Sequence, residues 1–124
     1  MTGRDHPFAH GRLAYIQIPA LDVRESAAFY KDIFGWQVRP GTAAHLSFTD
    51  ATGDIIGAFV TGRTITEPGV ILYIYVHGFD ATLEKMTAAG SAVVREPYPE
   101  GDIWVATLRD PAGNVIGIWQ FDPR

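Results

Sequence analysis

Apolar positions along the chain recur with two spacings, one typical of strands and one typical of helices. Apolar and polar positions alternate in short segments bounded by turn residues, which predicts strands at 14–18, 36–39, 44–49, 54–60, 72–76, 91–96, 102–108 and 114–121. Helical spacing predicts one helix between Asp22 and Gly35 and another between Asp80 and Gly90. Each aspartate is expected to cap its helix and each glycine to end it.

A sequence repeat supports this series of elements. Residues 50–59 are DATGDIIGAF and residues 110–119 are DPAGNVIGIW. Upstream, LAYIQIPALD at 13–22 aligns with LYIYVHGFD at 72–80, so the repeat covers a strand and the start of a helix as well. Tight turns at ATGD and PAGN are expected to join the last two strands of each copy. Each half of the chain is therefore predicted to run strand, helix, strand, strand, strand.

This repeat defines the predicted domain organisation. An N-terminal arm at 1–12 precedes a single domain at 13–124. Within the domain, module 1 spans 13–60 and module 2 spans 70–121. The segment 61–69 between them has the Gly, Pro and polar content of a linker.

Alternation within the strands also predicts which side chains face the helix of each module. The aliphatic set should pack under the helix, because burying it there is the main stabilising term. The opposite set should face a cup enclosed by the two modules, and it consists of Tyr15, Gln17, Gly57, Phe59, Tyr73, Tyr75, Gly117 and Trp119. Aromatic walls with a few polar groups fit a small organic ligand. The alternative is that these aromatic residues only fill the space between two sheets.

Composition and charge exclude several classes of function. With 47% hydrophobic residues, the chain can build a core, and its longest apolar runs are too short to cross a bilayer. The net charge of −4 and the lack of a basic stripe argue against a nucleic-acid partner. The absence of cysteine removes disulfide and thiolate chemistry. No apolar leader is visible at the N-terminus, so a cytoplasmic protein is expected.

Two motifs in combination resemble those of a known family. IPALDVRESAAFYKDIFGW at 18–36 and RDPAGNVIGIWQ at 109–120 resemble the vicinal oxygen chelate superfamily, which includes glyoxalase I, extradiol dioxygenases and bleomycin-resistance proteins. The resemblance extends from about Leu13 to Phe121. It implies an α+β fold in which paired βαβββ modules form a cupped mixed β-sheet with the helices outside. It also implies a homodimer.

The resemblance also indicates where a metal would be held. Metal-using members of the superfamily place His, Gln or Glu ligands on the first and last strands of each module. Motif alignment puts Tyr15, Gly57, Tyr73 and Gly117 at those positions. Glycine has no ligating side chain and neutral tyrosine is a poor ligand for divalent ions. We therefore expect no metal and no cofactor. His6, His10 and His77 are expected in the arm or in a loop, outside any site.

Four further features are candidate parts of the site. His45 would face the cup if its strand neighbours Leu46 and Phe48 face the helix, and it is the best acid–base candidate. Arg109 could hold a ligand carboxylate, or it could be a surface residue paired with an aspartate. Trp104 could contact the ligand from a lid or simply pack. The acidic segment YPEGD at 98–102 is predicted to be a solvated rim loop.

Together these features predict a metal-independent small-molecule-binding protein of the glyoxalase/bleomycin-resistance type, with an aromatic or amphipathic ligand. The expected ligand contacts are Tyr15, Gln17, Phe59, Tyr73, Tyr75, Trp104, Arg109 and Trp119. One alternative is a metal-independent lyase or isomerase that uses Tyr15, Tyr73 or His45 for proton transfer. A metal-dependent lyase or dioxygenase ranks lower, because no His/Glu set can be assembled at the required positions. An accessory domain acting through protein contacts stays open. The sequence favours a binding protein over an enzyme.

Overall fold

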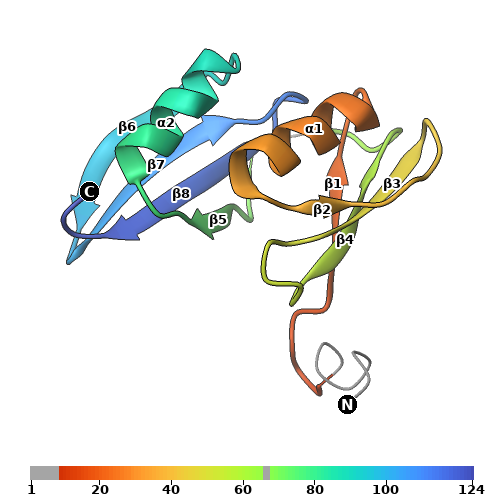
Figure 1. The fold of residues 1–124 in the computed structure, drawn as a ribbon, viewed down its shortest axis with the longest axis horizontal. Helices are drawn as coiled ribbons and strands as arrows, with labels where there is room; N and C mark the ends of the chain where they lie inside the picture. Colours follow the sequence, from red (N-terminus) through yellow and green to blue (C-terminus); the bar gives the residue numbers. More distant parts are fainter. Residues whose placement is uncertain (1–8, 66–67) are drawn as a thin grey trace. The chain divides into compact units, whose positions relative to one another are not determined.

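Two compact units make up the chain. The computed structural model describes residues 9–65 and 68–124, so His6 and most of the predicted arm lie outside the described residues. The first unit ends at Arg63 and the second begins at Thr64. Each contains one helix and one four-stranded mixed sheet (Figure 1). The α+β class and the two βαβββ modules are thus confirmed, while the cup between them stays a prediction.

Both modules have the same element order. The first contains β1 (Tyr15–Pro19), α1 (Val23–Phe34), β2 (Gln37–Val38), β3 (His45–Thr49) and β4 (Ile56–Val60). The second contains β5 (Leu72–Tyr75), α2 (Phe79–Ala88), β6 (Val93–Glu100), β7 (Ile103–Arg109) and β8 (Val115–Phe121). The sheets run β1-β4-β3-β2 and β5-β8-β7-β6, and in each the first and last strands of the module are parallel neighbours. Neither helix in the described chain is long and apolar enough to cross a membrane.

The two helices begin differently. The Asp22 side chain accepts hydrogen bonds from the backbone N–H groups of Arg24 and Glu25, at 3.0 and 3.4 Å, as predicted for an N-cap. In α2 the cap is Gly78, without a side-chain bond, so the predicted cap at Asp80 is wrong. The first N–H of α2, from Phe79, instead donates to Gln120 Oε1 of β8 at 2.6 Å. A side chain of the sheet therefore does part of the work that a capping residue would do.

An aromatic cluster fills the space between α1 and its sheet. Tyr30 of the helix stacks on Trp36, with ring centroids 4.6 Å apart, and Trp36 stacks on Phe48 at 4.8 Å. Phe59 completes the cluster, 4.8 Å from Phe48 and 5.3 Å from Tyr30, and is fully buried. The prediction that Phe59 faces the open side of the sheet is therefore wrong.

Strand register explains why the first module differs from its prediction. Gly57 pairs with Phe48 and with Ile16, on the face that α1 covers. The face of β4 away from α1 instead carries Ile56 and Ala58, which were predicted to face the helix. Because side chains alternate along a strand, a shift of one residue moves the whole set to the other face.

The hairpin turn before β4 is the source of this shift. Thr49 pairs with Ile56 in the first module, whereas Arg109 pairs with Val115 in the second, so the first turn contains one more residue. In the second turn the Asn114 side-chain amide donates to Asp110 Oδ2 at 2.9 Å, and the Asn114 carbonyl accepts from the Asp110 backbone N–H at 2.8 Å, directly before the ladder begins. Asp54, its counterpart in the repeat, has no amide to donate and would bring a second carboxylate to Asp50.

The second module matches its predicted faces. Tyr73 pairs with Gly117, and Trp119 pairs with both Tyr75 and Val105, so these residues share the face away from α2. Ile118, on the opposite face, is fully buried. The aromatic residues of this sheet therefore stay partly open to solvent, whereas those of the first module form its core.

Strand β6 differs from its prediction. It continues to Glu100, so most of YPEGD belongs to a strand and only its end forms the turn to β7. Its pairing with β7 shifts register between Val93 and Arg95 and again between Arg95 and Tyr98. Arg95 pairs with Thr107 and Tyr98 pairs with Val105, so both lie on the open face although they are three residues apart.

Replacement of Asn114 tests the account of the turns. Asn114→Asp should lower the free energy of unfolding by about 1–3 kcal/mol, because the donor is lost and a carboxylate faces the buried Asp110. Urea unfolding measures this change. The matched variant Asp54→Asn should stay within about 0.5 kcal/mol of the wild type. Equal losses in the two variants would contradict the explanation.

Candidate functional site

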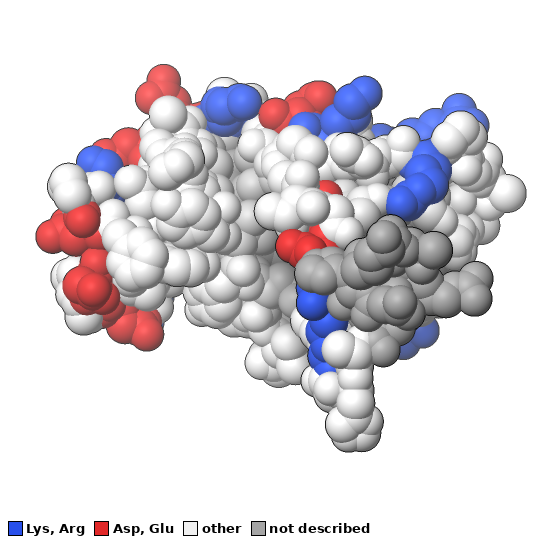
Figure 2. Space-filling view, turned by 60° about the horizontal axis from the view of Figure 1, so that its bottom comes forward, with Lys and Arg blue, Asp and Glu red and all other residues white. Residues whose placement is uncertain are grey.

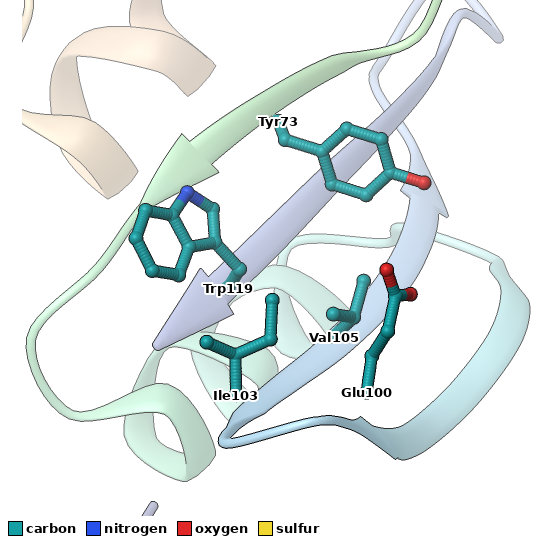
Figure 3. Close-up of a pocket in the computed structure, with 5 residues that line it drawn as sticks. All are labelled: Tyr73, Glu100, Ile103, Val105 and Trp119. Atoms are coloured by element: carbon teal, nitrogen blue, oxygen red, sulfur yellow. The ribbon is translucent and has the colours of Figure 1, made fainter. Parts of the chain in front are cut away.

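The open face of the second module contains a cavity of about 320 Å³. Five residues line it, contributed by all four strands: Tyr73, Glu100, Ile103, Val105 and Trp119 (Figure 3). Their arrangement follows from the register, because the ladders place their side chains on one face of the sheet. The site therefore depends on the pairing within one module.

Aromatic and aliphatic side chains form most of this wall. Trp119 makes edge contacts with Tyr75 and Phe121, with ring centroids 5.0 and 5.1 Å apart. Tyr73 and Tyr75 are 47% and 46% exposed, which leaves their rings available to a ligand. Ile103 and Val105 form the apolar floor between the aromatic residues and the acidic side. Such a wall favours a ligand with a planar or apolar body.

A polar side closes the cavity opposite the indole. Figure 3 shows the Tyr73 hydroxyl and the Glu100 carboxylate on one side of the pocket and the Trp119 ring on the other. Nearby, the Tyr98 hydroxyl donates to Glu100 Oε2 at 3.4 Å, and the Arg95 guanidinium lies 3.5 Å from the centre of the Tyr98 ring.

The environment of Tyr98 keeps its hydroxyl protonated. Partial burial raises the pKa of Tyr98, the Arg95 charge opposes this, and the negative charge of Glu100 raises it further. Tyr98 is therefore a hydrogen-bond donor to Glu100 across the neutral pH range.

Two predicted ligand contacts of the second module lie elsewhere. Trp104 pairs with Gln120 on the face that carries α2, and its Nε1 donates to Asp122 Oδ1 at 2.8 Å. Arg124 lies over the same indole at 4.3 Å, so Trp104 packs near the C-terminus rather than lining the pocket. Arg109 donates to the Gly113 carbonyl at 2.8 Å, within the hairpin turn. Its guanidinium binds the turn and does not line the cavity.

The predicted contacts of the first module form a separate group. Arg63 donates to Gln17 Oε1 at 3.2 Å, and the Gln17 amide donates to the Tyr15 hydroxyl at 3.5 Å. His45 is exposed and lies on the same face, because Leu46 and Phe48 do face the helix. It pairs with Val60, at the opposite end of β4 from the partner of Tyr15. The structure therefore does not bring His45 and Tyr15 together, and a catalytic role for His45 stays a prediction.

The donor set does not fit the metal centre that the superfamily implies. In the second module Gly117 lies beneath the Tyr73 ring, and a Cβ there would come within 2.3 Å of Tyr73 Cδ1. In the first module Gly57 faces α1, and the positions of β4 on the other face are the aliphatic residues Ile56 and Ala58. Within residues 9–65 and 68–124, no three His, Asp or Glu side chains are grouped as metal ligands. Aliphatic and tyrosine side chains do not supply the donors that divalent ions need.

Glu100 is the polar site residue that the sequence prediction missed. The acidic segment YPEGD predicts a solvated rim loop, whereas Glu100 is the last residue of β6. Two-residue spacing from Tyr98 to Glu100 was the signal that could have placed both on one strand face. Ile103 was also missed, although its two-residue spacing from Val105 puts both side chains on the same face of β7.

Comparison with known proteins assigns the family. A model of the glyoxalase-like domain family matches residues 15–118. The chain belongs to this family. This confirms the resemblance to the vicinal oxygen chelate superfamily, whose metal-ligand positions are not reproduced here.

Individual relatives carry related descriptions. A glyoxylase-like domain-containing protein of Didymella fabae is 37% identical over 89 residues, covering 65% of this chain and 70% of that protein. The putative glyoxylase CFP32 of Mycobacterium bovis is 24% identical and covers 91% of this chain, but the match spans only 47% of its own length. Among solved structures, TnmS3, an antibiotic-binding protein from Streptomyces sp. CB03234, has a TM-score of 0.70. It is 24% identical, with 93% of this chain and 99% of that one covered.

The two repeated glycines, Gly57 and Gly117, test which face of its strand each one occupies. Gly57→Ala should lower the free energy of unfolding by about 3 kcal/mol, because its Cβ would lie 2.2 Å from the Ile16 carbonyl oxygen and 2.5 Å from Phe48 Cζ. Gly117→Ala should cost about 1 kcal/mol, since the half-exposed Tyr73 ring can move aside. Urea unfolding gives both values, and Gly69→Ala, with open space around the new methyl group, is the control. Equal costs at 57 and 117 would contradict the assignment of opposite faces.

Proposed function

We propose that this chain binds a small organic molecule with an aromatic or apolar body in the pocket of the second module, without a metal. The observation that carries the proposal is the cavity between Tyr73 and Trp119, which are partly exposed rings on the open face of a sheet. Exposed aromatic walls around a concave site are typical of ligand pockets.

The size of the cavity limits the ligand. Its volume of about 320 Å³ lies near the lower end of the range of roughly 300–1,000 Å³ found for ligand sites. A molecule of one or two rings fits this volume, and a larger ligand would place only one part of itself here. TnmS3, which has the same fold, is described as an antibiotic-binding protein, and this supports small-molecule binding as the role of this chain.

Metal independence rests on the residues themselves. Tyr73 and Gly117 occupy the ligand positions of the second module, and the Tyr73 ring fills the space above the glycine. A homodimer and a cytoplasmic location, both expected from the sequence, remain part of this proposal.

A metal-independent lyase or isomerase is the second candidate. One observation favours it: the Tyr73 hydroxyl and the Glu100 carboxylate lie on the same side of the pocket, where both could exchange protons with a ligand. Turnover of a bound compound separates the two functions, because a binding protein returns its ligand unchanged.

Equivalent tyrosines of the two modules provide a matched pair of variants. Tyr73→Ala should weaken binding of 2-naphthol, used as a planar probe, by about tenfold through loss of ring contact. Tyr15→Ala removes a tyrosine of similar exposure, 49% against 47%, from the first module and should leave binding unchanged. Isothermal titration calorimetry measures both affinities, with EDTA and with added Zn²⁺ or Ni²⁺.

Two other outcomes would contradict the location of the site or its independence of metal. Loss of binding in Tyr15→Ala alone would move the site to the first module. A requirement for Zn²⁺ or Ni²⁺ would overturn metal independence. Trp104→Phe serves as a further control, because Trp104 lies on the opposite face of the same sheet and should not affect the affinity.

A further inference from the structure

The geometry of the pocket points to the charge of its ligand. Building on the function proposed above, we propose that the second module selects an organic cation with an ammonium group attached to an aromatic body. Glu100 is the residue that recognises the positive charge of this ligand. The aromatic body would lie against Trp119 and the ammonium group would lie beside the carboxylate.

A carboxylate and two hydroxyl groups gather on or beside the polar side of the cavity. The Tyr73 hydroxyl and the Glu100 carboxylate share that side, and the Tyr98 hydroxyl donates to Glu100 Oε2 at 3.4 Å. A carboxylate has several acceptor positions, so one long hydrogen bond leaves it able to accept from a ligand. An ammonium group has three donors and no acceptor, which complements this set of oxygens.

The charge of Glu100 is not neutralised by an ion pair within the described part of the chain. Arg95 is the cation that lies near it, and its guanidinium is over the Tyr98 ring at 3.5 Å. This contact shows that the aromatic residues of this face accept a cation. A ligand cation between Glu100 and the ring of Tyr73 would combine the same attraction with a direct charge pair.

The surrounding charge favours the same sign of ligand. Residues 68–124 contain seven Asp and Glu against four Lys and Arg, whereas residues 9–65 contain five of each. Figure 2 shows several acidic side chains close together at its left edge, where the second module is drawn. A negative potential around the mouth of a site raises the local concentration of cations.

Arg95 supports the opposite interpretation, in which it anchors an anionic ligand. Its guanidinium lies on the open face, as the pairing with Thr107 shows. However, Arg95 does not line the cavity, whereas Glu100 does. The cationic ligand is therefore the better fit, and the two interpretations predict opposite responses to mutation.

Three naphthalene probes of nearly equal size separate these possibilities. They are 2-naphthylmethylammonium, neutral 2-naphthylmethanol and anionic 2-naphthoate, each titrated into the full chain by calorimetry at low salt. The cation should bind about threefold to tenfold more tightly than the alcohol, as expected for one exposed charge pair with a cation–π contribution. The preference should shrink as salt is raised.

Matched variants assign the preference to Glu100. Glu100→Gln should remove most of the preference for the cation over the alcohol, leaving only the cation–π contribution, while affinity for the alcohol stays unchanged. Glu96→Gln makes the same change in net charge on the same strand but outside the cavity lining, and it should retain most of the preference. Arg95→Gln should keep or increase affinity for the cation.

Each contrary result has a distinct meaning. Equal affinity of the wild type for cation and alcohol would overturn the charge selection while leaving the proposed binding function intact. Tighter binding of 2-naphthoate, lost in Arg95→Gln, would overturn it in favour of an anion site. Failure of all three probes to bind would contradict the proposed function itself.

Discussion

The length of one hairpin turn in each module determines which side chains of the last strand face the helix and which face the other side of the sheet. In the second module Asp110 accepts from the backbone N–H groups of Ala112 and Asn114 and from the Asn114 amide, which holds the turn at five residues between Arg109 and Val115. In the first module Asp50 accepts from the N–H groups of Asp54 and Ile55, and the turn is one residue longer. Since strand side chains alternate, this single residue exchanges the two faces of β4.

The two modules consequently use their aromatic residues in different ways. Phe59 lies under α1, in the cluster with Tyr30 and Phe48, where it contributes to stability. Trp119, at the matching place in the repeat, stays on the open face and lines a cavity. Gly57 and Gly117 follow the same division, because one makes room for a buried ring and the other lies beneath an exposed one.

Much of the fold could be predicted from the sequence, and the errors have local causes. The order of the elements and the faces of β5 and β8 came from periodicity and the repeat, which depend on many positions at once. The face of β4 depended on one turn, where Asp and Asn look interchangeable in an alignment but differ in whether they can donate a hydrogen bond. Tyr73 and Trp119 were identified for the site, whereas Glu100 was missed because proline and glycine around it are typical of loops.

The irregular pairing of β6 has a consequence for how this molecule meets other chains. Its register shifts and its two prolines, Pro97 and Pro99, interrupt the row of backbone donors along the outer edge of the sheet. An edge of this kind is a poor template for an added strand, so it protects against aggregation by edge-to-edge pairing of sheets. The same irregularity that brings Arg95 and Tyr98 to one face thus also disfavours the addition of strands from other chains at β6, which is the step that would lead to fibres.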